Sequence, residues 1–246
     1  MLTLSSGSLY KFGLNRIFHF AKKLSFEGVE IMVNDIADTR NVSYMRDLSR
    51  QYDLPITALC LPKGANRAIF EKVLKMAEEL NVPTLVIRSP EWSNLSYWQW
   101  LRSELPKLQS LTRVKLCLEN SPMGNSVFVP SYAFGNINDF RRFKYMTLDT
   151  SHLFTRNLDL MRVYSMLKNN IAHIHFADVR KNKEHIMPGE GVLPLESFLT
   201  RLHKDNYKGQ ICVKLDFREL GYDEEIIEEK LKTVRDFYET YFLGIK

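Results

Sequence analysis

Eight short segments of this chain are apolar and rich in β-forming residues, and longer segments with helical periodicity lie between them. Several of the short segments are almost continuously apolar, as expected for parallel strands that are buried on both faces. No Gly-x-Gly-x-x-Gly motif follows the first segment, so the sequence does not favour a dinucleotide-binding sheet. The predicted strands cover residues 2–5, 29–33, 56–61, 84–88, 115–119, 146–149, 172–176 and 210–215.

The intervening segments repeat apolar residues every three to four positions, which predicts amphipathic helices. Strands that alternate with helices along one chain indicate parallel βα units. Eight such units in 246 residues favour a closed barrel over an open sheet. We therefore expect an α/β protein with a single domain, a (β/α)8 TIM barrel that spans residues 1–246. The predicted helices cover residues 15–24, 66–80, 97–111, 158–167, 195–203 and 223–241.

Composition and charge narrow the class of protein. A hydrophobic fraction of 45% and a charged fraction of 26% are typical of a globular protein with a sizeable core. The chain has no run of about eighteen apolar residues, so a membrane span is not expected. The first residues do not have a basic segment followed by an apolar one, so a signal peptide is not expected. The net charge is +5, but most basic residues alternate with acidic ones, which predicts a mildly basic surface rather than one that binds nucleic acid.

The three cysteines point to a reducing environment. Cys60, Cys117 and Cys212 each lie inside an apolar predicted strand. An odd number without Cys-x-x-Cys spacing indicates reduced thiols in a core rather than disulfides. We therefore expect a cytoplasmic protein.

Ionisable residues end three consecutive predicted strands. Glu119 ends the fifth strand, Asp149 ends the sixth, and His175 lies at the end of the seventh, while His152 follows three residues after Asp149. Functional residues of such barrels lie at the carboxyl ends of the strands, and neighbouring strands are only about 4.8 Å apart. Two carboxylates and an imidazole that converge there would suit Mn²⁺, Co²⁺, Zn²⁺ or Mg²⁺.

Each of these residues also has an ordinary structural interpretation. The two carboxylates could form salt bridges at the barrel mouth, because a buried carboxylate needs a cation nearby. His173 and His175 lie on the same strand face, so one of them could be a core histidine with satisfied hydrogen bonds. His152 could cap the helix that follows.

Several segments together resemble the xylose isomerase-like barrel superfamily. This superfamily includes sugar isomerases and epimerases, hydroxypyruvate isomerase-like proteins, inosose dehydratase-like proteins and endonuclease IV. Each segment alone is weak, but their order and spacing are fairly specific, and they run along most of the chain. The segments cover residues 26–31, 118–120, 148–152, 173–178, 188–193 and 207–211.

The resemblance implies a role for each matching residue. It implies a metal-binding catalytic glutamate at Glu119, metal ligands at Asp149 and His175, and contact with substrate hydroxyls at His152. Lys181 falls where a substrate-binding arginine is often found, and with Arg180 it forms a basic loop that could clamp a phosphate or carboxylate. Glu30 resembles a carboxylate of the substrate pocket. The implied reaction is isomerisation or epimerisation of a small polyhydroxy carbonyl compound by proton transfer next to the carbonyl.

The chain departs from this pattern at the eighth strand. The family usually has a second glutamate five residues after the glycine that matches Gly209, and here that residue is Lys214. Glu119, Asp149 and a charged Lys214 sum to −1 without a metal ion, and to +1 with a divalent ion. Either Lys214 bridges the carboxylates in place of the metal, or the metal stays and Lys214 is neutral or turned away. Asp216, about 7 Å further along the same strand face, could replace the missing ligand if the strand end bends inward.

Three functions remain open at this level. The leading hypothesis is an isomerase or epimerase of a sugar or sugar phosphate, in which Lys214 acts as acid–base partner of Glu119 or forms a Schiff base. The second is a metal-poor barrel that has lost catalysis and binds sugars or serves as a scaffold. An abasic-site endonuclease is disfavoured, because it resembles a three-metal design with histidines where this chain has Leu61, Pro62, Arg88 and Ser89. A homodimer is left open.

Overall fold

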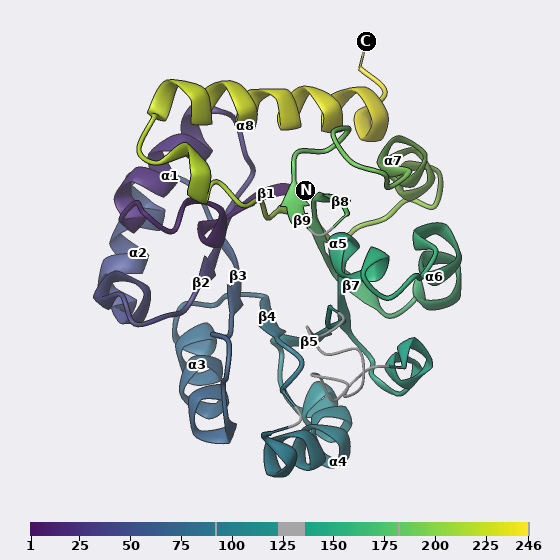
Figure 1. Cartoon of the computed structure of the whole chain (residues 1–246). Helices are drawn as coiled ribbons and strands as arrows, with labels where there is room; N and C mark the ends of the chain where they lie inside the picture. The colour runs from purple at the N-terminus through teal and green to yellow at the C-terminus, as the bar shows by residue number, and fades with distance from the viewer. Residues whose placement is uncertain (92, 123–135, 182, 246) are drawn as a thin grey trace.

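Eight parallel strands close into a barrel, and helices form an outer ring around it (Figure 1). This computed structural model describes residues 1–91, 93–122, 136–181 and 183–245. Every neighbouring pair of barrel strands is parallel, in the order β1-β10-β7-β6-β5-β4-β3-β2. The predicted (β/α)8 fold is therefore confirmed. The barrel strands are β1 Leu2–Ser5, β2 Val29–Met32, β3 Ile56–Cys60, β4 Thr84–Ile87, β5 Lys115–Glu119, β6 Met146–Asp149, β7 Ile171–Phe176 and β10 Gln210–Val213.

The predicted helices are present, and two more were not expected. The second helix of the chain, α2, buries only Met45 and Leu48, so its apolar periodicity is weak. The short helix α5 begins directly after β6, where Asp149 caps it by accepting hydrogen bonds from the backbone of Ser151 and His152. Both helices were missed because neither has a long apolar stripe. The helices are α1 Leu14–Lys23, α2 Val42–Gln51, α3 Arg67–Glu79, α4 Leu95–Leu111, α5 Thr150–Phe154, α6 Leu160–Leu167, α7 Leu195–Lys204 and α8 Glu224–Tyr238.

Apolar side chains fill the layer between the barrel and its helices. In α1, for example, Ile17, Phe18 and Ala21 face the core and are at most 2% exposed. Each large apolar side chain buried in this way contributes about 1.5–3 kcal/mol. The three cysteines are buried free thiols on the barrel strands β3, β5 and β10, as the sequence predicted.

A two-stranded antiparallel hairpin follows β7 and lies outside the barrel sheet. It consists of β8 Asp178–Arg180 and β9 Lys183–Ile186. The sequence predicted a basic loop here, and the structure has a tighter arrangement, in which Arg180 pairs with Lys183 on either side of the turn. The hairpin matters for function because it places a second set of ionisable side chains beside the strand ends.

The carboxylate of Asp178 holds the loop that follows this hairpin. It accepts hydrogen bonds from the backbone N–H groups of Val179, Gly189, Gly191 and Leu193, at 2.8–3.0 Å. A Cβ atom at Gly191 would lie 2.2 Å from Asp178 Oδ1, so only glycine allows this close approach. The Pro-Gly-Glu-Gly segment is therefore explained by backbone packing around one buried carboxylate.

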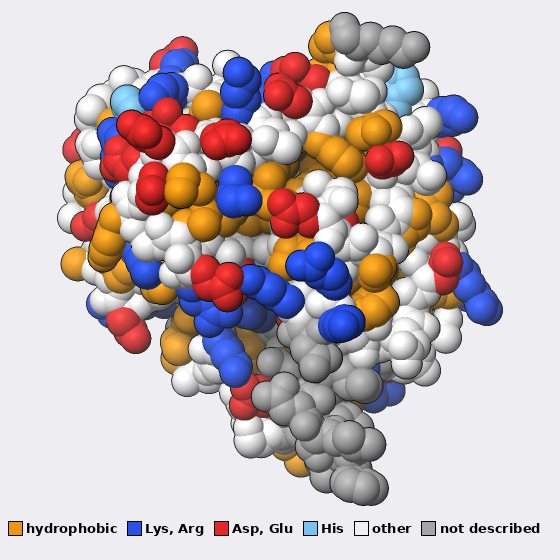
Figure 2. Space-filling view, turned by 45° about the horizontal axis from the view of Figure 1, so that its top comes forward, with side chains coloured by type: hydrophobic (Ala, Val, Ile, Leu, Met, Phe, Trp, Pro, Cys, Tyr) orange, Lys and Arg blue, Asp and Glu red, His pale blue; other side chains and the backbone are white. Residues whose placement is uncertain are grey.

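The surface agrees with the mixed charge pattern of the sequence. Figure 2 shows Lys and Arg side chains interleaved with Asp and Glu on the visible face. Among the helices that the structure describes, none is long and apolar enough to cross a membrane.

Candidate active site at the barrel mouth

Four ionisable side chains meet where β5, β6, β7 and β10 end. Glu119 and Asp149 are the last residues of their strands, His175 is the penultimate residue of β7, and Lys214 directly follows β10. All four are buried, with exposed fractions of 2%, 0%, 0% and 5% in that order. The carboxyl ends of the strands thus bring together the residues that the sequence grouped.

The ammonium of Lys214 lies among the three predicted metal ligands. Its Nζ atom is 2.9 Å from Glu119 Oε1, 3.1 Å from Asp149 Oδ2 and 3.1 Å from His175 Nδ1. Burial alone would lower the pKa of Lys214, but the two carboxylates raise it above its ordinary value. Lys214 is therefore not turned away from the carboxylates but bridges them, as in the first of the two arrangements that the sequence left open.

The imidazole of His175 is held between two carboxylates. Its Nδ1 atom lies 2.5 Å from Glu119 Oε1, and its Nε2 atom lies 2.9 Å from Glu30 Oε2. Burial alone would lower the pKa of His175, but Glu30 and Glu119 raise it to about 10. Both ring nitrogens therefore carry protons at neutral pH and donate to the carboxylates, so the 3.1 Å approach of Lys214 is a contact between two cations.

Glu30 lies behind His175 and is fully buried. Its Oε1 atom accepts a hydrogen bond from Ser5 Oγ at 2.7 Å, and its Oε2 atom also lies 3.1 Å from Nε2 of His173. Burial would raise the pKa of Glu30, but the two histidines hold it well below its ordinary value. His173, whose Nδ1 atom contacts Gln210, is the deeper and structural member of the histidine pair. Glu30 thus orients His175 rather than lining the pocket.

The donor set does not fit a divalent ion among Glu119, Asp149 and His175 as they stand. Atoms of these residues lie within 4.8 Å of one another, as a metal site requires. However, Nδ1 of His175 carries a proton, and Lys214 Nζ already contacts all three residues at 2.9–3.1 Å. A dication added there would face an ammonium and an imidazolium at short range, without the second glutamate that usually balances it.

His152 joins the site from α5. Its Nδ1 atom lies 2.8 Å from the carbonyl oxygen of Asn120, and its Nε2 atom lies 3.6 Å from Asp149 Oδ2. The cap of α5 is supplied by Asp149 and not by the imidazole. His152 also lines a small pocket at the barrel mouth, and Glu119 lines the same pocket. A substrate group in that pocket would therefore meet both His152 and Glu119.

The pocket brings in residues that the sequence interpretation did not assign. The guanidinium of Arg88, which follows β4, has its Nε atom 3.7 Å from Glu119 Oε2, and Lys63 lies at the rim. Their only sequence signal was a position just after a strand. The described residues that line this pocket are Pro62, Lys63, Gly64, Ala65, Arg88, Ser89, Pro90, Glu91, Glu119, Ser121, Pro122 and His152.

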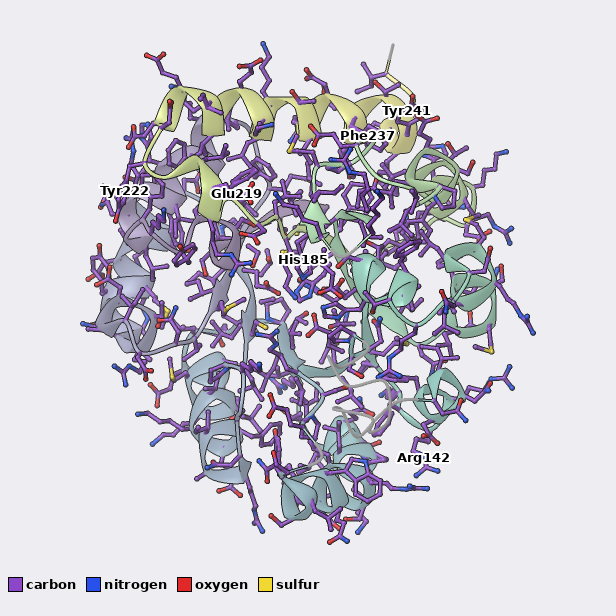
Figure 3. All side chains as sticks on the ribbon, viewed as in Figure 1. Arg142, His185, Glu219, Tyr222, Phe237 and Tyr241 are labelled. Carbon is purple, nitrogen blue, oxygen red and sulfur yellow. The ribbon has the colours of Figure 1, made fainter. Side chains whose placement is uncertain are left out.

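The β8–β9 hairpin supplies two further side chains that sequence reasoning missed. His185 has its Nε2 atom 3.9 Å from Asp149 Oδ2, and Glu184 has its Oε2 atom 4.0 Å from His152 Nε2. Figure 3 shows His185 near the centre of the ring of strands. Burial lowers the pKa of His185 to about 3. Burial raises the pKa of Glu184, and the negative charge of Asp149 raises it further. Their place in the loop after a barrel strand was the only available signal.

Three predicted site residues lie away from this cluster. Arg180 and Lys181 are exposed on the hairpin and do not line the pocket. Lys181 occupies the turn with a φ of +51°. Asp216 forms an ion pair with Arg218, so the chain after β10 does not bring its carboxylate to the other ligands.

Known proteins and solved structures match this chain over nearly its whole length. An uncharacterized protein of Mycobacterium leprae is 24% identical, over 95% of this chain and 96% of the relative. The solved structure of a D-tagatose 3-epimerase-like protein aligns with a TM-score of 0.71 at 19% identity, covering 96% of this chain and 98% of that chain. The 3-keto-D-glucoside 4-epimerase of E. coli aligns with a TM-score of 0.74 at 16% identity, with the same coverage.

A third structure has a sugar bound. D-allulose 3-epimerase from Methylomonas sp., solved in complex with D-allulose, aligns with a TM-score of 0.72 at 12% identity, covering 98% of this chain and 96% of that chain. At these identities the structural matches establish a shared fold. The family model described as xylose isomerase-like TIM barrel matches residues 18–237. The closed parallel barrel, its strand-end cluster and this match together show that the chain belongs to the xylose isomerase-like TIM barrel family.

Proposed function

We propose that this protein isomerises or epimerises a small polyhydroxy carbonyl compound, or its phosphate, by moving a proton at the carbon next to the carbonyl. The structural neighbours named as epimerases support the general class. The observation that carries the proposal is the ammonium of Lys214, which lies within 3.1 Å of Glu119, Asp149 and His175. It supplies the positive charge that the reaction needs beside the carbonyl oxygen.

In this proposal Lys214 polarises the substrate and Glu119 moves the proton. Burial would raise the pKa of Glu119, but Lys214 and His175 hold it well below its ordinary value, so the resting carboxylate is a weak base. When the Lys214 ammonium turns to the substrate oxygen, Glu119 loses one of its cationic partners and its basicity rises. Proton abstraction is thereby coupled to correct binding of the carbonyl.

A Schiff base on Lys214 is disfavoured by the same electrostatics. The amine must lose its proton to attack a carbonyl, and both carboxylates keep it charged. Lys214 is therefore assigned as an electrophile that stabilises negative charge on oxygen, and not as a nucleophile.

Solvent exchange tests the reaction. The full-length protein, both metal-stripped and supplied with Zn²⁺, is incubated in D₂O with a panel of ketoses, aldoses and their phosphates, and deuterium at the α carbon is measured by NMR. We expect exchange with at least one sugar, and a loss of at least about a hundredfold in Glu119→Gln, because removing a general base typically costs 10²–10⁴-fold. Lys214→Met should reduce kcat more than it changes KM.

A matched acidic substitution controls for charge. Glu190→Gln alters an exposed carboxylate outside the site and should leave exchange unchanged. Absence of exchange with every sugar in both states of the protein would refute the proposal, as would exchange that survives Glu119→Gln.

One observation favours a second function, a sugar-binding barrel without catalysis. The cluster is internally paired, because Lys214 bridges Glu119 and Asp149 while His175 bridges Glu30 and Glu119. Such a paired network could hold its polar groups in place to bind the hydroxyls of a sugar without transferring a proton. A sugar that binds in calorimetry but exchanges no deuterium would favour this function over the first.

A further inference from the structure

A second group of potential ligands lies beside Lys214, between α5 and the β8–β9 hairpin. It consists of the carboxylates of Asp149 and Glu184 and the imidazoles of His152 and His185. The Nε2 atoms of the two histidines lie 3.6 Å and 3.9 Å from Asp149 Oδ2, and Glu184 Oε2 lies 4.0 Å from His152 Nε2. The ligand atoms of Asp149 and both histidines all lie within 4.8 Å of one another.

The lone pair of His152 is directed into this group. Nδ1 lies 2.8 Å from the carbonyl oxygen of Asn120, which can only accept a hydrogen bond, so Nδ1 carries the proton. In the neutral ring, Nε2 is then the unprotonated nitrogen. A histidine that donates from one nitrogen to a carbonyl and offers the other to the site has the usual arrangement of a metal ligand.

The same reasoning fixes His185. The hydroxyl of Ser151 donates to Asp149 Oδ1 at 2.7 Å, so its oxygen must accept from Nδ1 of His185 at 3.2 Å. The free lone pair of His185 is again on Nε2. Among the residues that the structure describes, none donates a hydrogen bond to Nε2 of either histidine.

The backbone of the hairpin directs His185 inward at some cost. His185 has a φ of +57°, in the left-handed region that residues other than glycine rarely occupy. Its carbonyl oxygen accepts a hydrogen bond from the backbone of Asp216 at 2.8 Å, which ties the hairpin to the chain after β10. A left-handed conformation of this kind that is held in place by its surroundings is common at functional sites.

The size of the group matches a small divalent ion. With metal–ligand distances of 2.0–2.1 Å, the ligands of tetrahedral zinc lie about 3.4 Å apart. The separations of 3.6 Å and 3.9 Å between Asp149 Oδ2 and the two histidines need to contract by only a few tenths of an ångström. Glu184 lies outside the set of ligand atoms within 4.8 Å of one another, but its Oε2 atom is 4.0 Å from His152 Nε2, so it would move in as the fourth ligand. Two imidazoles and two carboxylates are also a donor set that suits Zn²⁺.

We propose that Asp149, His152 and His185 form a binding site for one divalent transition-metal ion, with Glu184 as the fourth ligand that closes on the ion and with Zn²⁺ as the best match. This site shares only Asp149 with the ligand set that the resemblance implied, and it leaves Lys214 in place. The charges also balance, because a divalent ion neutralises Asp149 and Glu184 while Lys214 neutralises Glu119. The proposal concerns binding and does not depend on the proposed reaction.

Cobalt provides the direct test, because Co²⁺ bound by nitrogen and oxygen ligands with tetrahedral geometry absorbs strongly in the visible range. Metal-stripped full-length protein is titrated with Co²⁺ and then with Zn²⁺ as competitor. We expect one Co²⁺ per chain with a tetrahedral spectrum that Zn²⁺ abolishes. His185→Gln and His152→Gln should each weaken binding at least about tenfold, since even outer-shell changes at metal sites cost 10–100-fold.

Two controls separate this site from metal bound elsewhere on the protein. His203→Gln changes an exposed histidine of α7, and Glu190→Gln changes an exposed carboxylate outside the proposed site. Both should bind Co²⁺ as the unaltered protein does, and circular dichroism should show that all variants are folded. Failure of the unaltered protein to bind Co²⁺ would overturn the proposal, as would binding that survives His185→Gln. Co²⁺ binding is measured by its spectrum and not by activity. A protein that binds Co²⁺ as expected but exchanges no proton with any sugar would therefore refute only the proposed function.

Discussion

At the scale of single residues, position 214 determines the charge of the barrel mouth. A glutamate there would complete four metal ligands, whereas the ammonium of Lys214 instead pairs with Glu119 and Asp149 at 2.9 Å and 3.1 Å. Removing one partner of a buried ion pair typically costs about 3–5 kcal/mol, because the remaining charge is left uncompensated. The site therefore depends on Lys214 as much as on the carboxylates.

Restoring the glutamate should restore the usual metal site. We expect Lys214→Glu to be less stable than the unaltered protein without metal, because buried carboxylates then repel one another. Added Mn²⁺ should raise its unfolding midpoint, and manganese binding can be followed by electron paramagnetic resonance. The double variant with Glu119→Gln should lose this gain, and Lys214→Met serves as the control that removes the ammonium without adding a ligand. A Lys214→Glu variant that ignores Mn²⁺ would contradict the interpretation.

The imidazolium of His175 predicts a loss of stability at high pH. Its folded pKa of about 10 lies above the value near 6.5 of an unfolded histidine, so its contribution is complete below about pH 6.5 and disappears as the pH rises through 10. The free energy of unfolding should fall by roughly 2–4 kcal/mol over this window. Urea denaturation at several pH values measures this slope. His175→Gln should flatten it, and equal slopes in both proteins would argue against the charged imidazole.

At the scale of elements, the β8–β9 hairpin decides which side chains complete the site. It adds His185 and Glu184 to residues from β5, β6, β7 and β10, while Arg180 and Lys181 are exposed and lie outside the pocket. Its position depends on the carboxylate of Asp178, which holds the following loop through four backbone N–H groups. The hairpin is therefore a fixed part of the site.

The glycine beside Asp178 should be intolerant of a side chain. Gly191→Ala would place a Cβ atom 2.2 Å from Asp178 Oδ1 and force the loop to shift. We expect a destabilisation of about 1–3 kcal/mol, the usual range for overpacking, together with weaker Co²⁺ binding through displacement of His185. Val192→Ala, at a neighbouring residue that is 55% exposed, is the matched control. Equal stability of the two variants by urea denaturation would rule out this role for Gly191.

At the scale of the whole molecule, the barrel encloses groups that solvent cannot reach. Cys60, Cys117 and Cys212 are 0% exposed, and burial raises the pKa of each thiol. The thiolate is the reactive form, so these cysteines should be inert in the native protein.

Thiol labelling should therefore report global unfolding. We expect no cysteine to react with a thiol reagent in native buffer, and all three to react in concentrated urea. Under native conditions labelling should proceed at the rate of global opening, and stabilising the fold should slow it equally at all three positions. Rapid labelling of one thiol while circular dichroism remains native would reveal local opening of the barrel.

The alternation of apolar strands and amphipathic helices was sufficient to predict the barrel. Burial of both faces of a parallel sheet leaves continuous apolar runs in the sequence, and the helices that cover the sheet leave an apolar residue every three to four positions. The same topology predicted that Glu119, Asp149 and His175 would meet, since parallel strands end at one rim, and it left open whether Lys214 bridges the carboxylates or turns away. The position of a residue at a strand end does not specify how deeply its side chain is buried or in which direction it points. Glu30 was expected in the pocket and lies fully buried behind His175.

Only the tertiary structure brought His185 and Glu184 to Asp149. Their position depends on an antiparallel hairpin, a left-handed backbone at His185 and the hydrogen bonds of Asp178, none of which has a periodic signature in the sequence. The sequence by itself therefore determined the fold and the identity of the charged residues at the strand ends. The three-dimensional structure decided their pairing, because the energies of buried charges depend on distances that only the folded chain defines.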